Sequence, residues 1–583
     1  MNISENWFYA LKKEGVEITQ IPCCAIPFQL ESDGVIDLDT LNPEEHPEFE
    51  ESFVYNSFEL DSDMELSLSG SADWYWEVYL NGEKIFSVME TGNKTCFFQP
   101  GYHFFTGIGR NGQNLLTVHI RRGANSGSFG FAEMRPLPPP KELTVTVDPD
   151  ETLGKIKYMN AVNNGPCIAR GDQTRGNLPL WKAAKIPYAR NHDAAFWSGY
   201  GGEHSVDIHA IFPDFSKDPY DPASYDFTLT DRFHFQIMEG GTKVFFRLGS
   251  KIEHNPKKYG TQVPPDFKKW AVICEHIIRH CNEGWADGHH MNIEYWEIWN
   301  EPDLSSGQED KKTWQGTDEE FFELFRIAAT HLKKCFPHLK IGGPAFAGNQ
   351  RWLKRFLAAM VTGERVPMDF FSWHIYCTEP AMISATAGMI RKMLDDHGYD
   401  KTESILNEWN YVRSWSAEFI YSIETIISIK GAVFTAAGMS SGQDAPVDML
   451  MYYDARPCAF NGMFDFYTFR PLKGYYPFIA WSKLLELGTQ IKVDNGGRNS
   501  IYATAAADGK GKIGMLLSNY VECDELPEAI SLTVKVKGRD LTDAKLYIVD
   551  RERSFEETAF RKNSDGGISF EMEPNTFVYL EKI

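Results

Sequence analysis

The first 140 residues alternate hydrophobic and polar positions with the two-residue period of a β-strand. In the stretch WYWEVYLNGEKIF, one face carries Trp74, Trp76, Val78 and Leu80. Asn81-Gly82 follows them, and Asn-Gly after an alternating run is the strongest short signal for a hairpin. A further alternating run, NLLTVHIRRG, lies later in the region. Residues 1–140 are therefore predicted to form a β-sandwich accessory domain.

A run of prolines ends this β-rich region. The stretch MRPLPPPKEL contains Pro136, Pro138, Pro139 and Pro140. Because proline has no backbone N–H to give to a strand ladder, the run predicts a linker. A domain boundary is therefore expected close to residue 140.

Between residues 150 and 485 the pattern changes to short apolar runs separated by amphipathic helices. The runs KVFFRLG, YWEIWN, LKIGGPA, DFFSWHIY and SILNEWN have the length and apolar content of buried strands. The helix TDEEFFELFRIAATHLKKCF begins with Thr317 and Glu320 in the spacing of a capping box. Repeated strand–helix units of this kind predict parallel strands closed into a (β/α)8 barrel, with a doubly wound sheet as the competing topology.

The last hundred residues return to strand patterns, in KIGMLLSNYV, AISLTVKVKG and AKLYIVDRE. They predict a small C-terminal β-sandwich over residues 486–583. The predicted fold class is therefore α/β, a TIM barrel over residues 150–485 with a β-sandwich on either side of it.

The net charge and the cysteine positions exclude several kinds of partner and site. The 583-residue chain has a net charge of −23 and a pI near 5.2, which argues against nucleic acid or an anionic membrane as a partner. No apolar run approaches the roughly 18 residues of a membrane span, and no apolar run follows a basic start. The ten cysteines include no C-x-x-C pair, so neither zinc nor a disulfide framework is indicated. These features predict a cytoplasmic protein.

Two short motifs match known signatures without the structural context that those signatures need. GIGRNG fits G-x-G-x-x-G, but the strand-like QNLLTVHI follows it, whereas a dinucleotide site requires a helix there. GMSSG, around Ser440, fits the G-x-S-x-G of serine esterases, but QDAPVDML is a poor helix start for a nucleophile elbow. The first motif is interpreted as a glycine-rich turn, and the second is kept only as a rival.

Two glutamates follow buried strands and have asparagine and tryptophan as neighbours. Glu301 ends the run in MNIEYWEIWNEPDL, and Glu408 lies in SILNEWN. With LKIGGPA and DFFSWHIY as the strands between them, Glu301 ends strand four and Glu408 ends strand seven. These strand ends face each other across the mouth of an eight-stranded barrel. Two carboxyl groups about 5–5.5 Å apart can protonate a leaving group and attack an anomeric carbon, with retention.

These motifs resemble those of the clan A glycoside hydrolases, and of family 39 (the β-xylosidase and α-L-iduronidase family) in particular. EIWNEPDL and NEWN carry the likeness, and AVNNGP, IPYARNHDAAF, RLGSKIEH, IGGPA and SWHIY are similar to other strands of that barrel. PLKGYYPFIAWSKLLELG looks like its closing helix. The resemblance implies a retaining glycosidase, most simply an exo-acting β-xylosidase-like enzyme on small glycosides or oligosaccharides, without a metal or cofactor.

The resemblance also implies roles for particular residues. Glu301 would be the general acid/base, with a raised pKa, and Glu408 the ionised nucleophile. Asn300 would hydrogen-bond the sugar 2-hydroxyl. His374 and Tyr376, which share one face of a strand, would orient Glu408 and line the sugar subsite.

A further set of residues is expected to bind substrate with less support from the motifs: His192, Glu253, His254, Trp409 and Tyr453. For His192, Glu253 and His254, a polar residue with a purely structural role is an equal interpretation. Many clan A enzymes place a tryptophan at the end of strand eight as a stacking floor. Here DMLMYYDARP offers Tyr452 and Tyr453 instead, which leaves the shape of the sugar subsite open.

Alternative functions stay open at this point. An α-L-arabinofuranosidase, an iduronidase-like enzyme and an endo-acting glycosidase share the same paired carboxylates, and a uronic acid would need a cationic clamp such as Arg190 or Arg456. A non-catalytic carbohydrate-binding protein is the rival from another class. WYWEVYLNG resembles the jelly-roll accessory domains of β-galactosidase-type enzymes, which implies a domain packed on the barrel, with carbohydrate binding by its aromatic residues as the alternative. Since relatives often assemble, a homo-oligomer is also among the expectations.

Overall fold

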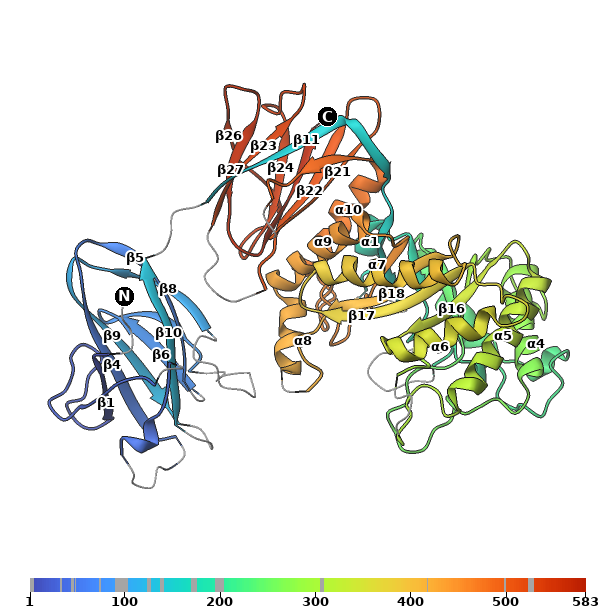
Figure 1. The fold of residues 1–583 in the computed structure, drawn as a ribbon, viewed down its shortest axis with the longest axis horizontal. Coiled ribbons are helices and arrows are strands. Elements are labelled where there is room, and N and C mark those ends of the chain that lie inside the picture. The colour runs from blue at the N-terminus through green and yellow to red at the C-terminus, as the bar shows by residue number, and fades with distance from the viewer. Residues whose placement is uncertain are drawn as a thin grey trace.

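The computed structural model shows a chain built from three parts, two of β-strands and one of alternating strands and helices (Figure 1). The described part of the chain covers residues 5–582 with thirteen gaps. The gaps are 32–33, 43–46, 48, 73–74, 90–102, 123–126, 137–140, 169–175, 194–203, 305–308, 417, 498–499 and 523–528. Trp74 and the prolines 138–140 of the predicted linker lie outside the described residues.

The N-terminal part is a β-sandwich, as predicted. Its strands are β1 (Trp7–Leu11), β2 (Ile26–Phe28), β3 (Val35–Asp37), β4 (Glu51–Leu60), β5 (Met64–Ala72), β6 (Tyr75–Leu80), β7 (Glu83–Ser87), β8 (His103–Gly109), β9 (Gly112–Arg121) and β10 (Ser128–Pro136). They form a six-stranded sheet, β2-β1-β4-β9-β6-β7, and a four-stranded sheet, β3-β10-β5-β8. The predicted hairpin joins β6 to β7, and Asn81 and Gly82 both have positive φ, as a type I′ turn requires.

The GIGRNG motif is a turn between antiparallel strands. Gly107 and Gly109 belong to β8, and Gly112, with φ of 90°, begins β9. No helix follows the motif in this part of the described chain, so it has no dinucleotide-binding geometry.

The barrel closes through eight parallel strands in chain order, which excludes the doubly wound alternative. The strands are β12 (Tyr158–Asn163), β13 (Tyr188–Arg190), β14 (Lys243–Leu248), β15 (Tyr295–Ile298), β16 (Lys340–Phe346), β17 (Phe370–Cys377), β18 (Glu403–Tyr411) and β19 (Met449–Tyr452). Pairing of β12 with β19 completes the ring. A layer of inward-facing side chains, among them Tyr188, Phe245, Tyr295 and Phe370, fills the interior below the mouth.

Helices surround the barrel. They are α1 (Leu178–Ala184), α2 (Ile208–Ile211), α3 (Thr228–Glu239), α4 (Phe267–Glu283), α5 (Asp318–Cys335), α6 (Gln350–Val361), α7 (Ala381–Asp396), α8 (Phe419–Ile427), α9 (Ile429–Asp444) and α10 (Tyr476–Leu487). Thr317 and Glu320 form the predicted capping box at the start of α5. No single described helix is long and apolar enough to cross a membrane, although α8 and α9, bent by 79°, meet the length and composition criteria together.

The GMSSG motif lies inside the buried helix α9 rather than in a turn between a strand and a helix. A Cβ atom at Gly438 would come 2.6 Å from the ring of Trp409, and one at Gly442 would come 2.9 Å from Leu450. The two glycines therefore let α9 approach the barrel closely, and Ser440, which is 2% exposed, is not placed as a nucleophile.

The C-terminal part is one ten-stranded sheet that curls around its own core. Its order is β25-β24-β28-β22-β21-β20-β11-β23-β27-β26. The strands are β11 (Lys141–Lys155), β20 (Thr489–Asp494), β21 (Ile501–Ala507), β22 (Ile513–Asn519), β23 (Ile530–Val536), β24 (Lys545–Val549), β25 (Ser554–Thr558), β26 (Arg561–Lys562), β27 (Ile568–Met572) and β28 (Thr576–Lys582). Val147, Met515, Leu532 and Ile548 share one hydrophobic core.

Strand β11 changes the predicted domain boundaries. Residues 141–155 come before the barrel in sequence, yet β11 pairs antiparallel with β20 and in parallel with β23 in the middle of the C-terminal sheet. The sequence assigned residues 150–155 to the barrel and only residues 486–583 to this sandwich. That assignment is wrong for β11, because LTVTV alternates like any strand and does not reveal which sheet it joins.

The two sandwiches relate to the barrel differently. Leu516, Phe577 and Tyr579 of the C-terminal sheet belong to the same hydrophobic core as the barrel helices α9 and α10. The N-terminal sandwich has a core of its own, which includes Trp7 and Trp76, and it stands apart from the barrel (Figure 1). The expectation that this sandwich packs on the barrel is not met by the described residues.

Candidate active site

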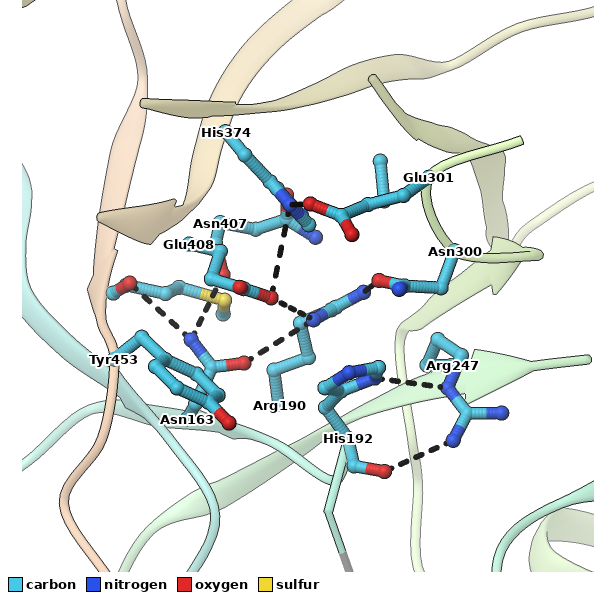
Figure 2. A network of polar contacts seen from close by, with 12 residues as sticks. Asn163, Arg190, His192, Arg247, Asn300, Glu301, His374, Asn407, Glu408 and Tyr453 are labelled. Atoms are coloured by element: carbon cyan, nitrogen blue, oxygen red, sulfur yellow. Dashed lines mark hydrogen bonds and ion pairs between the residues drawn. The ribbon is translucent and has the colours of Figure 1, made fainter. Parts of the chain in front are cut away.

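Glu301 and Glu408 point toward each other at the mouth of the barrel (Figure 2). Glu408 lies in β18, and Glu301 follows the end of β15 in a left-handed conformation with φ of 49°. His374 of β17 lies between them, with its Nδ1 atom 2.7 Å from Glu301 Oε1 and 3.6 Å from Glu408 Oε2. One carboxyl oxygen of each glutamate lies within 4.8 Å of the other. The predicted placement on strands four and seven therefore brings the two carboxyl groups together.

Glu408 is held by two donors from different strands. The Tyr376 hydroxyl of β17 donates to Glu408 Oε1 at 2.6 Å, and Arg190 Nη1 of β13 donates to Glu408 Oε2 at 3.2 Å. Both donors favour the ionised carboxylate. Glu301 has no such pair of donors, since its carboxyl group contacts only His374 among the described side chains.

Arg190 forms a buried centre beneath the two glutamates. Its side chain is 0% exposed, and it donates to Glu297 at 2.7 Å, to Asn300 at 2.7 Å and to Asn163 at 3.2 Å, besides Glu408. Sequence reasoning considered Arg190 only as a clamp for a uronic acid. The structure shows it fully engaged below the site, so it is not available as that clamp.

Glu297 is a functional-site residue that the sequence analysis missed. It is fully buried in β15, and Glu297 Oε1 accepts hydrogen bonds from Ser372 Oγ at 2.5 Å and from the Asn407 amide. Its ion pair with Arg190 completes the polar layer under the mouth. A charged residue inside the apolar run YWEIWN was the signal that could have identified it, because buried acids need a partner.

The surroundings separate the two glutamates chemically. Burial raises the pKa of Glu301 and that of Glu408 to about 7 each. Because two like charges this close oppose each other, the pair retains one proton near neutral pH. Arg190 and Tyr376 stabilise the charge on Glu408, so the proton resides on Glu301. Burial also lowers the pKa of His374 to about 4, which keeps its ring neutral.

Asn300 and His192 line the same site (Figure 2). Asn300 Oδ1 accepts from Arg190, which fixes the amide and leaves its NH2 group without a described protein partner. His192 follows β13, and its Nδ1 atom accepts from Arg247 Nε at 3.2 Å. Arg247 is in turn paired with Asp207 at 2.6 Å. The His192 proton must therefore sit on Nε2, where it can be donated.

Trp409 does not reach the site, contrary to the prediction. Its ring is buried, 5.8 Å from Phe434 of α9 and 5.9 Å from Tyr452. Successive residues of a strand point to opposite faces, so a strand that aims Glu408 inward must aim Trp409 outward. Tyr452 is likewise buried outside the mouth, whereas the hydroxyl of Tyr453 reaches Asp193 Oδ2 at 2.6 Å and so lies at the site.

Glu253 and His254 are also placed differently from the prediction. The Glu253 carboxylate accepts hydrogen bonds from the backbone N–H groups of Tyr259, Gly260 and Thr261, and from the Thr261 hydroxyl at 2.7 Å. It therefore stabilises its own loop, which is the structural interpretation left open above. His254 is exposed and shows no contact with Glu301 or Glu408 among the described residues.

An aromatic wall, which we define as Tyr376, Trp415, Phe419, Tyr453 and Phe460, stands beside Glu408. Trp415 meets Tyr376 edge-on at 4.9 Å and lies 6.0 Å from both Phe419 and Phe460. Phe460 is 5.7 Å from Tyr453. Trp415 is 60% exposed, which is unusual for a tryptophan and offers a free ring face at the mouth. The sequence analysis named Tyr376 and Tyr453 but missed Trp415, Phe419 and Phe460, because Trp415 and Phe460 lie in loops without periodicity and Phe419 only begins α8.

Three groups of side chains in the described chain have donor atoms close enough to hold a metal ion. One is Glu301, His374 and Glu408 themselves; the others are Asp231, His280 and His289, and Glu275, His331 and Cys335. The last two groups belong to the outer helices α3, α4 and α5 and the segment after α4. The proton chemistry of the paired glutamates requires no metal.

The fold and the site place the chain in the class of (β/α)8-barrel proteins built around two facing glutamates at strands four and seven. Residues 145–424 match the model of glycosyl hydrolases family 39.

Two curated β-xylosidases are similar in sequence. That of Caldicellulosiruptor saccharolyticus is 31% identical over 256 residues, which is 42% of this chain and 49% of that protein. That of Geobacillus stearothermophilus is 32% identical over 170 residues, which is 27% of this chain and 31% of that protein. The chain thus spans half or less of the length of these relatives.

Solved structures share the fold at lower identity. A glucosidase from Croceicoccus marinus aligns with a TM-score of 0.60 and 22% identity, over 76% of this chain and 98% of that one. A family 39 β-xylosidase from Caulobacter crescentus aligns with a TM-score of 0.54 and 15% identity, over 75% and 99%.

Proposed function

We propose that the protein is a retaining glycoside hydrolase, most simply an exo-acting β-xylosidase-like enzyme on small glycosides or oligosaccharides. The observation that carries the proposal is the asymmetric pair of carboxyl groups at the barrel mouth. Glu301 and Glu408 lie within reach of one anomeric centre, and only Glu408 has Arg190 and Tyr376 as donors.

In the first step Glu301 gives its proton to the glycosidic oxygen while a Glu408 oxygen attacks the anomeric carbon. The C–O bond to the leaving group breaks, its electron pair stays with the departing oxygen, and a covalent glycosyl-enzyme forms on Glu408. Burial keeps Glu301 protonated until that step, because its pKa is raised to about 7. Covalent bond formation removes the charge of Glu408, and with it the repulsion that favours protonation of Glu301.

In the second step Glu301, now a carboxylate, takes a proton from water as the water oxygen attacks the anomeric carbon. The bond to Glu408 breaks, and the sugar leaves with its original anomeric configuration. Asn300, fixed by Arg190 through its carbonyl oxygen, presents its NH2 group to a sugar hydroxyl in both steps. Such a hydrogen bond contributes to rate when it is stronger in the transition state than in the ground state.

The named activities of relatives support a xyloside as the first substrate to try. The two curated proteins similar in sequence are called β-xylosidases. An α-L-arabinofuranosidase from Thermotoga maritima shares the fold with a TM-score of 0.53 at 14% identity, over 76% of this chain and 100% of that one, so an arabinofuranoside stays the second candidate. The cytoplasmic location and the homo-oligomeric state stay predictions.

The deciding experiment is hydrolysis of a panel of aryl glycosides, with proton NMR on the first sugar released. The panel contains a β-xyloside, an α-arabinofuranoside, a β-glucoside, a β-galactoside and an α-iduronide. We expect one neutral member to be hydrolysed with the anomer initially retained. An initially inverted anomer would overturn the double-displacement mechanism, and a carbohydrate that binds without turnover would favour the non-catalytic alternative.

A further inference from the structure

Asp193 occupies the site without a part in the chemistry described so far. It follows His192 and is 7% exposed. Its backbone is held on both sides, because its N–H donates to Asn164 Oδ1 at 2.8 Å and its carbonyl oxygen accepts from Arg456 Nη1 at 2.9 Å. Tyr453 donates to Oδ2 at 2.6 Å. Asp193 is therefore held by three contacts, two at its backbone and one at its carboxylate.

The second carboxylate oxygen, Asp193 Oδ1, has no hydrogen-bond partner among the described residues. His192 Nε2 lies 3.9 Å from Asp193 Oδ1, and His204 Nδ1 lies 4.0 Å from it. These separations exceed the roughly 2.7–3.2 Å of a hydrogen bond. Since Arg247 occupies His192 Nδ1, the proton of His192 sits on Nε2, on the side of Asp193 Oδ1. A donor and an acceptor thus lie 3.9 Å apart, and one hydroxyl group can bridge them because a hydroxyl both donates and accepts.

The Asp193 carboxyl group carries a negative charge. Although burial opposes ionisation, contacts with His192, Arg456 and Tyr453 hold the pKa of Asp193 below its ordinary value, so it is a carboxylate at neutral pH. The arginines around it are already paired: Arg190 with Glu297 at 2.7 Å, Arg247 with Asp207 at 2.6 Å and Arg456 with Asp454 at 3.0 Å. A sugar carboxylate beside Asp193 Oδ1 would meet the Asp193 anion, and Arg456, whose Nη2 atom lies 3.8 Å from Asp193 Oδ2, is already shared with Asp454.

We propose that Asp193, together with His192, binds a hydroxyl group of the glycone and restricts the enzyme to neutral sugars. The inference rests on the proposed function, and it names the substrate class as pentosides or hexosides rather than uronides. Tyr453, at the end of strand eight, then acts as a positioning residue, because its hydroxyl fixes the Asp193 carboxylate instead of lying free. Arg247 has the same kind of role for His192.

The first test compares the wild-type enzyme with Asp193→Asn on the aryl glycoside that the wild type hydrolyses fastest. We expect kcat/KM to fall about 100-fold. The reason is that the hydrogen bond from the sugar hydroxyl to a buried carboxylate is strong, and most of its contribution is lost when the charge is removed. Asp226→Asn, an exposed aspartate before α3, is the matched control and should change kcat/KM less than twofold. Tyr453→Phe keeps the carboxylate and is expected to lose only about 10-fold.

Deoxy substrates distinguish binding from a merely structural role. The 2-, 3- and 4-deoxy analogues of the same glycoside are assayed with wild-type enzyme and with Asp193→Asn. For the analogue that lacks the bound hydroxyl, the two enzymes should be equally slow, whereas the others keep the 100-fold difference. The same ratio for every analogue, or unchanged kcat/KM in Asp193→Asn, would overturn the inference and leave the glycosidase proposal standing.

Calorimetric binding of the free neutral sugar gives a readout without turnover. Wild-type enzyme should bind the sugar more tightly than Asp193→Asn, and Glu408→Gln should still bind it although it hydrolyses nothing. Efficient wild-type hydrolysis of an aryl uronide would contradict the inference but not the mechanism. Absence of both sugar binding and glycoside hydrolysis would overturn the proposed function, and this inference with it.

Discussion

The carboxyl groups of the two glutamates have different contacts, so we expect Glu301 and Glu408 to affect activity in different ways. In Glu408→Gln the side chain keeps its shape and loses the charge that attacks the anomeric carbon. We expect kcat to fall by about 10⁴-fold or more, with unchanged thermal unfolding, because the nucleophile has no substitute. Steady-state kinetics on an aryl xyloside and a melting curve provide the measurement. Glu323→Gln, exposed on α5, is the control, and residual activity above 1% in Glu408→Gln would refute the nucleophile role.

In the proposed mechanism, the protonation of Glu301 determines how activity depends on pH. Its pKa is raised to about 7 by burial, and the first step needs the protonated form. As pH rises through about 7 the acid is lost, so kcat/KM for an aryl xyloside should fall about tenfold per unit above that value. A dinitrophenyl glycoside, whose leaving group needs little protonation, should fall less steeply. A kcat/KM that stays constant up to pH 9 for both substrates would contradict the assignment.

Single residues show what the sequence could and could not predict. The paired glutamates were predictable because a carboxylate that directly follows a buried barrel strand projects into the mouth of the barrel. Trp409 could have been excluded from the site beforehand, because successive residues of a strand point to opposite faces and Trp409 directly follows Glu408. Glu253 could not, since only the folded loop reveals the three backbone N–H groups that donate to its carboxylate. Asp193 could not be predicted either, because its role as a hydroxyl-binding residue depends on the positions of His192 and Tyr453 in the folded protein.

At the scale of elements, Arg190 links strands that are distant in sequence. It joins β13 to β12 through Asn163, to β15 through Glu297 and to β18 through Glu408. Arg190→Met leaves the Glu297 charge buried without its cationic partner, so we expect the free energy of unfolding to drop by about 3–5 kcal/mol. Denaturant titration followed by tryptophan fluorescence measures it. Arg351→Met, exposed on α6, should stay within about 0.5 kcal/mol, and an equally small effect at Arg190 would refute the linking role.

The segment between β18 and α8 carries the exposed member of the aromatic wall. Trp415 offers a ring face to the leaving group of the substrate, and aromatic stacking contributes about 0.5–1.5 kcal/mol. Trp415→Ala should therefore raise KM for a disaccharide about 2- to 12-fold while kcat changes little. The comparison variant is Phe49→Ala, an exposed aromatic of the N-terminal sandwich. If KM for the disaccharide is unchanged in Trp415→Ala, the wall plays no part in binding the leaving group.

Strand order within the barrel was predictable, whereas the partner of β11 was not. Each buried run between 243 and 410 had the apolar content of a strand covered on both faces, so barrel strands could be counted along the chain. The β11 pattern fixes only a period of two residues. Its partners, β20 and β23, lie more than 300 residues away in sequence, and local signals carry no information on such pairing.

At the scale of the whole molecule, the N-terminal sandwich has a separate core, which predicts that the barrel and the C-terminal sheet fold without it. A fragment of residues 141–583 should fold and keep kcat/KM within about twofold, because the described barrel and C-terminal cores use no residue before 141. A fragment that begins at residue 156 removes β11 from the middle of the C-terminal sheet and should be unfolded or insoluble. Circular dichroism and activity test both. Equal stability of the two fragments would contradict the role given to β11.

The position of β11 also has a consequence for how the chain is made. Its partner strand β23 begins at Ile530, nearly 400 residues after β11 begins at Lys141. Ribosomes add about 5–20 residues per second, so β11 leaves the ribosome roughly 20–80 s before β23 exists. Until β20 (Thr489–Asp494) is also made, the emerging barrel is tethered to a strand with both edges unpaired, a target for chaperones that bind extended segments. The C-terminal sheet can therefore be completed only after all the barrel strands have been made.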